Sequence, residues 1–344
     1  MRIAEIAPPW FPVPPPGYGG VELVVGLLAD GLEARGHDVT LFASGGSRST
    51  ADLVMPLPDA PDPELLGNTW FESLHALRAY LDAGRFDVVH DHSGIVGPAL
   101  GALLGGRPPI VHTLHGPWTE PARRYYELLH DRVHLVAISH AQRADNAGLR
   151  YAGVVHNGID LEAYPFQPDS DDFLVYIGRA SPDKGPVEAL EVARRAQLPL
   201  AMIVKKNEPP EQRYWNEVVA PQLTDDIDVL EHVPHAVKAD LLGRARALLF
   251  PIRWSEPFGL VMVEAMACGT PVVACPFGAA VELVEPGVTG FLHESVEDLA
   301  EAVRRAGECA PAACRERVAR HFSADQMVAG YEQIFAAVAA GLRT

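Results

Sequence analysis

The sequence predicts an α/β protein made of two layered units, each with a mostly parallel sheet. Short apolar segments alternate with amphipathic segments along the whole chain, which is typical of strands that alternate with helices. This alternation stops in EAYPFQPDSDD, within residues 161–172, a polar and proline-containing stretch suited to a linker. A chain of 344 residues with 48% hydrophobic content can bury two cores. We therefore expect a first domain over residues 1–165 and a second over 166–323.

In the first half, each expected strand is a short apolar run. A helix is expected between the first two strands, over residues 21–35, and Gly36 closes it. The expected strands are residues 2–7, 39–43, 87–91, 109–114, 135–139 and 153–156.

The second half repeats the pattern, and a last helix is expected over residues 324–340. Its expected strands are FLVYIGR (173–179), LAMIVKK (200–206), IDVLEHV (227–233), ALLFPI (247–252), PVVAC (271–275) and TGFL (289–292).

Composition excludes several classes of partner. The net charge of −17 argues against nucleic acid or an anionic membrane as the main partner, because both are bound through basic surfaces. The longest apolar stretch, GIVGPALGALLGG, is too short to span a bilayer and contains Pro98, so we expect no stable membrane insertion and a cytoplasmic protein. The four cysteines lack the paired spacings of a zinc site and are expected as packed thiols.

Two glutamates, Glu256 and Glu264, are the most informative residues of the chain. They lie in SEPFGLVMVEAMACGTPVVAC, which predicts a strand, a loop, a helix that ends at Gly269, and a second strand. The start of that helix offers unpaired backbone N–H groups, which suit a diphosphate, and a carboxylate on either side can accept hydrogen bonds from sugar hydroxyls. The alternative is a solvated helix with a loop acid. The apolar neighbours of Glu264 argue against it, because a carboxylate buried there is costly without partners.

This E-x7-E element resembles the signature of the retaining GT-B glycosyltransferases of family 4, the glycosyl transferases group 1. IAPPWFPVPPPGYGGVELVVGLLADGLEARGHDVTLFA, HTLHG, AISHA, VVHNGID, YIGRASPDKG and HFSADQMVAGYEQIF follow in the order usual for that family. The resemblance implies two Rossmann-like domains that face each other across a cleft. It also implies that the C-terminal helix, residues 324–344, packs back on the first, acceptor-side domain, while the second domain binds the nucleotide sugar.

Two cations are the expected ligands of the donor phosphates. Arg179 ends a strand and Lys184 opens the next expected helix, so both emerge at the carboxyl edge of the second sheet, where ligands of open α/β sheets bind. Without the resemblance, such a pair would be interpreted as a surface arginine and lysine. The resemblance favours a diphosphate site. The resemblance also places the donor at Phe258, Gly259 and Leu260. The base is expected near Val233, with UDP favoured.

The first domain supplies further candidates. Gly19 and Gly20 follow the first strand and open a helix, so their backbone can approach a phosphate, although a flexible loop is an equally good interpretation. His115 resembles the family histidine near the donor sugar. Tyr18, Asp91 and His92 are candidates for the acceptor side, and hydrogen-bonded loop groups remain the alternative for Asp91 and His92.

No metal and no cofactor are expected besides the co-substrate. Asp169-Ser170-Asp171 and Asp226-Ile227-Asp228 spell D-x-D, but one falls in the expected linker and the other just before a strand, so both are interpreted as solvated acids. Lys205 and Lys206 replace the Gly-rich turn usual in the family, and their role stays open.

The sequence therefore predicts a retaining glycosyltransferase that uses a nucleotide-diphosphate sugar. The expected acceptor is a hydroxyl of a small or amphiphilic metabolite, and similarity to antibiotic-pathway enzymes of the avilamycin type suggests an antibiotic precursor. A GT-B sugar-nucleotide epimerase or hydrolase, and a non-catalytic nucleotide-sugar-binding protein, are the alternatives. The oligomeric state cannot be predicted.

Overall fold

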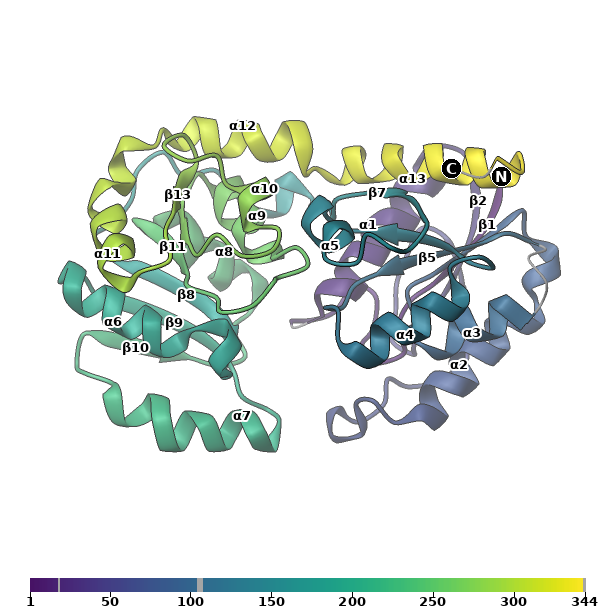
Figure 1. The fold of residues 1–344 in the computed structure, drawn as a ribbon, viewed down its shortest axis with the longest axis horizontal. Helices are drawn as coiled ribbons and strands as arrows, with labels where there is room; N and C mark the ends of the chain where they lie inside the picture. Colours follow the sequence, from purple (N-terminus) through teal and green to yellow (C-terminus); the bar gives the residue numbers. More distant parts are fainter. Residues whose placement is uncertain (18, 104–107, 343–344) are drawn as a thin grey trace. The chain divides into compact units, whose positions relative to one another are not determined.

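The computed structural model describes residues 1–17, 19–103 and 108–342, apart from the side chain of Pro63. The chain forms two compact units. The first comprises Met1–Gly158 and Ala324–Thr344, and the second comprises Ile159–Ser323. Each unit has its own sheet with helices on both faces (Figure 1).

The first unit is built on a seven-stranded parallel sheet in the order β3-β2-β1-β4-β5-β6-β7. The connections reverse direction between β1 and β4, which is the switch point where doubly wound sheets bind their ligands. The strands are β1 (Arg2–Ile6), β2 (Asp38–Phe42), β3 (Asp52–Val54), β4 (Val88–Asp91), β5 (Ile110–Leu114), β6 (His134–Ala137) and β7 (Tyr151–Val154).

Helices cover both faces of this first sheet. Ala4 and Ile6 of β1 belong to a buried apolar cluster with Tyr80 of α2 and Ala102 of α3, so these two helices cover one face. Alternate residues of the same strands point to the other face, where α1 and α13 pack against each other (Figure 1). The helices are α1 (Gly20–Ala34), α2 (Thr69–Leu81), α3 (Val96–Leu103), α4 (Glu120–Leu129), α5 (His140–Ala144) and α13 (Ala324–Ala339).

The second unit has a six-stranded parallel sheet in the order β10-β9-β8-β11-β12-β13, with its switch point between β8 and β11. Its strands are β8 (Leu174–Arg179), β9 (Leu200–Lys205), β10 (Ile227–Leu230), β11 (Ala247–Phe250), β12 (Val272–Ala274) and β13 (Gly290–Leu292). Its helices are α6 (Pro186–Ala196), α7 (Pro209–Tyr214), α8 (His235–Arg244), α9 (Leu260–Cys268), α10 (Ala280–Leu283), α11 (Val296–Arg305) and α12 (Pro311–His321).

The predicted fold class, two parallel-sheet α/β units, is confirmed. The expected strands lie within a few residues of the observed ones, and the one strand missed is β3, which has three residues at the sheet edge. The last helix, expected over residues 324–340, is observed as α13 (Ala324–Ala339). In the described part of the chain, none of the helices has both the length and the apolar content that crossing a bilayer requires. The four cysteines are buried free thiols.

Candidate active site

Most of the predicted donor residues lie on two loops at the switch point of the second sheet. One loop follows β8 and the other follows β11, and these strands are neighbours. The Arg253 backbone N–H donates to the Asp183 carbonyl oxygen at 2.8 Å. A Cβ added to Gly185, whose φ is +70°, would lie 2.0 Å from the Pro251 oxygen. A glycine is therefore required where the two loops touch.

Lys184 and Glu256 form an ion pair that bridges these loops. Lys184 Nζ lies 2.5 Å from Glu256 Oε2, and the two side chains are only 15% and 12% exposed. The ammonium group also lies 4.6 Å from the ring centroid of Trp254, within cation–π range. Lys184 does not open a helix as expected. It ends a 3₁₀ turn, and α6 starts at Pro186, because Gly185 takes a left-handed conformation and a proline favours the first helical position.

Arg179 is the last residue of β8, and its side chain is held loosely. Its guanidinium nitrogens lie 3.5 Å from Asp183 Oδ2 and 3.8 Å from Glu211 Oε1, and the side chain is 34% exposed. Long contacts of this kind leave the planar donor groups available to a phosphate. Glu211 of α7, which sequence reasoning missed, is 4% exposed and also lies 3.8 Å from Lys205 Nζ.

Glu264 lies in α9 and is 5% exposed. Its Oε1 accepts hydrogen bonds from the Tyr164 hydroxyl at 2.7 Å and from Lys238 Nζ at 2.8 Å. Both of these hydrogen bonds go to Oε1, so within the described ranges Oε2 is left to accept from a ligand hydroxyl. Sequence reasoning missed Tyr164 and Lys238. Tyr164 lies in the stretch that was interpreted as a linker, and yet it is 1% exposed.

The start of α9 provides the predicted anion position. Gly259 has a φ of +91° and precedes Leu260, the first helical residue, and no side chain caps the free N–H groups. Phe258 is 2% exposed, so only its backbone can face a ligand. Val233, the expected neighbour of the base, is half-buried in the loop between β10 and α8.

In the first unit, Gly19 precedes α1 and Gly20 begins it, while Tyr18 lies outside the described residues. Gly19 has a φ of +143°, and an added Cβ there would lie 2.8 Å from Pro15 and 3.1 Å from Glu22 Oε2. Glu22, not singled out from the sequence, is 4% exposed, and burial raises its pKa to about 7.

Asp91 is the last residue of β4 and His92 follows it, and their side chains have different partners. Asp91 is fully buried, and it accepts hydrogen bonds from the Tyr80 hydroxyl at 2.6 Å and from the Ser93 backbone N–H at 2.7 Å. This placement favours the structural alternative for Asp91. His92 Nδ1 lies 2.7 Å from Nε2 of His115, which follows β5. Burial lowers the pKa of both rings to about 3, so both are neutral at pH 7.

One acid of each D-x-D sequence is engaged with a neighbouring residue. Asp171 pairs with Arg244 at 2.7 Å, and Asp226 accepts a hydrogen bond from the Thr224 hydroxyl. Lys205, the last residue of β9, pairs with Glu208 at 3.0 Å, and Lys206, the next residue, pairs with Glu231 at 3.1 Å.

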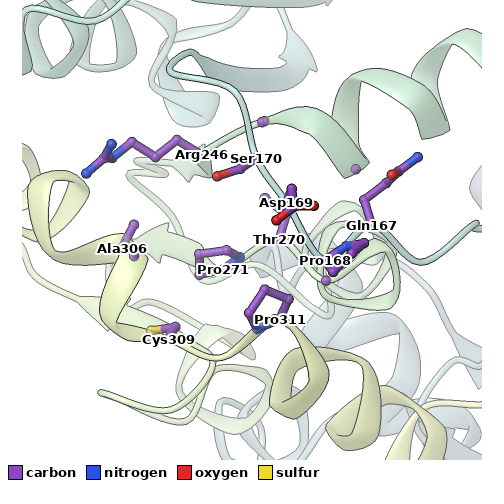
Figure 2. Close-up of a pocket in the computed structure, with 14 residues that line it drawn as sticks. Gln167, Pro168, Asp169, Ser170, Arg246, Thr270, Pro271, Ala306, Cys309 and Pro311 are labelled. Atoms are coloured by element: carbon purple, nitrogen blue, oxygen red, sulfur yellow. The ribbon is translucent and has the colours of Figure 1, made fainter.

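A pocket of about 260 Å³ lies on the second unit, with Pro168, Pro271 and Pro311 among the residues around it (Figure 2). Two of the lining residues come directly before strands, Arg246 before β11 and Pro271 before β12. The pocket therefore opens at the amino ends of these strands. None of the predicted site residues lines this pocket. The candidate site is at the opposite edge of the sheet, at the carboxyl ends of β8 and β11, with Arg179, Lys184 and Glu256.

Replacing Gly185 with alanine should lower the free energy of unfolding by about 3 kcal/mol, since the new methyl group meets Pro251 and the left-handed backbone is strained. Gly287 is the matched control, because its φ is +77° and no atom lies within 4 Å of an added Cβ. Gly287→Ala should cost only about 1 kcal/mol. Urea unfolding measures both, and equal losses would show that the loop contact is unimportant.

Comparisons with known proteins identify the family of the chain. The family described as "Glycosyltransferase Family 4" matches residues 18–163, and the family described as "Glycosyl transferases group 1" matches residues 162–320. The two matches together span both units. The chain belongs to glycosyltransferase family 4, and it is a glycosyltransferase with the GT-B fold.

Named relatives share this domain pair over most of their length. The D-inositol 3-phosphate glycosyltransferase of Arthrobacter sp. (strain FB24) is 28% identical, over 88% of this chain and 86% of the relative. The glycogen synthase of Mycobacterium tuberculosis (strain H37Rv) is also 28% identical, over 100% and 96%.

Solved structures superpose on nearly the whole chain. AviGT4, a glycosyltransferase involved in avilamycin A biosynthesis, has a TM-score of 0.77 at 26% identity, over 99% of this chain and 98% of its own. Anabaena Alr3699/HepE, solved in complex with UDP and glucose, has a TM-score of 0.75 at 21% identity, over 98% and 99%.

Proposed function

We propose that this protein is a retaining glycosyltransferase that moves a hexosyl or pentosyl group from a nucleotide-diphosphate donor to a hydroxyl of a small or amphiphilic metabolite. The observation that carries the proposal is the placement of Arg179 and of the Lys184–Glu256 ion pair at the carboxyl ends of the neighbouring strands β8 and β11. Open α/β sheets bind their ligands at this edge, and a charged sugar donor needs both cations and a carboxylate.

Each part of the donor has a proposed partner in the second unit. Arg179 and Lys184 neutralise the diphosphate, together with the free N–H groups that follow Gly259. Oε2 of Glu264 accepts hydrogen bonds from the ribose, since Tyr164 and Lys238 hold its other oxygen. Glu256 orients the transferred sugar. The base lies near Val233.

The chemistry follows from the charge of the leaving group. As the bond from the anomeric carbon to the phosphate oxygen breaks, negative charge grows on the diphosphate, and preorganised cations lower the barrier. The departing phosphate can then take the acceptor's proton on the same face of the sugar, which gives retention without a sugar–enzyme ester. His115 is proposed to steady the sugar through a hydrogen bond.

The proposed classes of donor and acceptor are supported by what relatives of this protein bind or are named for. HepE, with the same fold, was solved with UDP and glucose, which supports UDP as the carrier. AviGT4 supports an antibiotic precursor as acceptor, and the relatives named D-inositol 3-phosphate glycosyltransferase add polyol phosphates to the acceptors worth testing.

We propose that donor binding needs no metal and that the protein holds no other cofactor. The basis is the two cations at the site and the engagement of Asp171 and Asp226, one acid of each D-x-D sequence, with their own neighbours. Turnover should therefore persist in excess EDTA.

Replacing Glu264 with alanine should raise KM for the donor about tenfold and change kcat much less. Ribose contacts are equally strong in the ground and transition states, so their loss weakens binding and not the chemical step. Steady-state kinetics with the preferred donor measures this split. If kcat collapses while donor binding stays unchanged, Glu264 takes part in the chemistry.

A donor panel tests the function. UDP-, GDP- and ADP-sugars are incubated with the protein, with and without candidate acceptors, and the released nucleotide is measured. Release that depends on the acceptor supports transfer. Release without acceptor indicates a hydrolase or epimerase, and binding without any release indicates a nucleotide-sugar-binding protein.

A further inference from the structure

Helix α2 of the first unit (Figure 1) carries apolar side chains on two opposite sides. Its inner side packs into the unit, where Ala76, Ala79 and Tyr80 belong to the buried apolar cluster. Its outer side is apolar too, and the residues there are 47–76% exposed: Trp70, Leu74, Leu77 and Leu81. A surface helix ordinarily keeps its outer side polar, so a row of exposed apolar residues indicates a surface that binds a partner. We call these four residues the α2 stripe.

The α2 stripe has the spacing of a contact between two helices. Its residues follow one another at intervals of four, three and four. With 3.6 residues per turn, this spacing keeps all four within about 60° around the helix axis. Alternating intervals of three and four are the pattern by which the facing residues of two packed helices repeat. The α2 stripe is therefore suited to a second helix that lies alongside it.

The two ends of α2 differ in charge. Asp62 and Glu64 lie just before the helix and are exposed. After the helix, Arg85 lies 4.0 Å from the carboxylate of Asp82, which already pairs with Arg78 at 2.6 Å. The end where α2 begins therefore carries excess negative charge, and the end where it stops carries excess positive charge. Two such helices attract each other when they run antiparallel and repel each other when they run parallel.

We propose that the α2 stripe binds the α2 stripe of a second copy of this chain, with the two helices antiparallel about a twofold axis that passes between Leu74 and Leu77. Trp70 of each copy then lies against Leu81 of the other, and Leu74 lies against Leu77. Every contact occurs twice, as in the isologous interfaces of dimers with twofold symmetry. The stripe thus covers itself.

The same arrangement brings opposite charges together at both ends of the interface. Residues equally distant from the axis in sequence lie opposite each other, so Arg85 falls opposite residues 64–66 of the second copy, which begin with Glu64. Leu65 and Leu66 of that segment are 40% and 46% exposed, and they extend the apolar contact. This extension matters because a stable interface buries about 800 Å² on each partner.

An anionic membrane fits this surface less well than a second copy does. Helices that lie on membranes carry lysine and arginine on the side opposite their apolar face. The only lysine or arginine of α2 is Arg78, and it is paired with Asp82. Asp62 and Glu64 would be repelled by anionic headgroups, as would a chain with a net charge of −17.

Sedimentation of the whole protein over a wide range of concentrations tests the pairing. We expect the mass to rise from 37.2 kDa toward twice that value as the concentration increases. Leu74→Glu should raise the dissociation constant about a hundredfold or more, because it buries an unpaired carboxylate at the centre of the interface. Leu128→Glu is the matched control, since Leu128 is 78% exposed on another helix, α4, and it should leave the constant unchanged. A monomer at every concentration, or a Leu74→Glu protein that dimerises like the wild type, would overturn the proposal.

Reversal of the end charges tests the antiparallel arrangement. Arg85→Glu and Glu64→Arg should each raise the dissociation constant about fivefold, because each places like charges together twice per dimer. An equimolar mixture of the two variants should regain the wild-type affinity, since every glutamate then meets an arginine. Single variants that pair as tightly as the wild type, or a mixture as weak as its components, would contradict the arrangement. Both positions are exposed, so this test stands even if Leu74→Glu does not fold.

Flotation with vesicles of phosphatidylglycerol and phosphatidylcholine tests the other occupant of the stripe. We expect the wild-type protein to stay unbound. Binding to the vesicles that Leu74→Glu abolishes would show that a membrane, and not a second copy, covers the stripe. None of these measurements uses a donor or an acceptor, so their outcome is independent of the proposed function.

Discussion

Replacing Lys184 with alanine should lower kcat/KM by a factor of about 10² to 10³ and weaken UDP binding about tenfold or more. The ammonium group is expected to stabilise charge that develops on the leaving diphosphate, and removal of one such preorganised group typically costs this much. The variant would also leave Glu256, only 12% exposed, beside the phosphates without its partner, and that repulsion adds to the loss.

Arg179→Ala should act on the same step, so the double variant should lose less than the product of the two single effects. Arg195→Ala is the matched control. This arginine, in the last turn of α6, pairs with Glu191 at 2.6 Å and lies away from the strand ends. The UDP affinity and turnover of Arg195→Ala should stay within about threefold of the wild type, because exposed ion pairs usually contribute little. Wild-type UDP affinity in both Lys184→Ala and Arg179→Ala would remove the diphosphate assignment.

The protein should lose stability steeply as the pH falls below about 6. Burial lowers the pKa of His75 to about 4 and of His90, His92 and His115 to about 3, well under the ordinary value of 6.5. Such groups contribute stability that is present above the unfolded pKa and is lost as pH falls from 6.5 toward the folded pKa, because the unfolded chain binds protons that the folded chain cannot. Each contributes up to about 1.4 kcal/mol per pH unit.

Two buried carboxyl groups act in the opposite direction. Burial raises the pKa of Glu5 to about 6 and of Glu22 to about 7, so their contribution is present below about pH 4.5 and is lost as pH rises through those values. When the histidines and these two carboxyl groups are combined, the free energy of unfolding should fall by about 2–3 kcal/mol per pH unit between pH 6 and 4.5. Urea unfolding at a series of pH values measures the slope.

His75→Leu should flatten this slope by about 1.4 kcal/mol per pH unit, because it removes one of these buried histidines. A free energy of unfolding that is constant from pH 7 to 5 would contradict the buried, neutral state of these rings.

The pattern of strands and helices was predictable from the sequence because hydrophobic periodicity reports which face of each element is buried. β3 escaped prediction because three half-exposed edge residues carry too little of that signal. The prediction that Lys184 opens a helix was wrong, because left-handed Gly185 separates the 3₁₀ turn that Lys184 ends from α6.

The partners of the site residues were harder to predict. Glu264 was predicted to accept from sugar hydroxyls, but its protein partner Tyr164 lies 100 residues away in a stretch whose polar composition resembles a linker. His92 meets His115 only because each follows the end of a strand and the two strands, β4 and β5, are neighbours in the sheet. Side-chain partners set by sheet register leave no local sequence signal.

The central claim, retaining transfer from a nucleotide-diphosphate sugar, is tested most directly by following one α-linked donor by ¹H and ³¹P NMR with acceptor in excess EDTA. We predict that the nucleotide is released as the intact diphosphate and that the first-formed product keeps the α configuration. A β-linked product, release of a nucleoside monophosphate with a sugar 1-phosphate, or turnover that returns only when Mg²⁺ or Mn²⁺ is restored would contradict it.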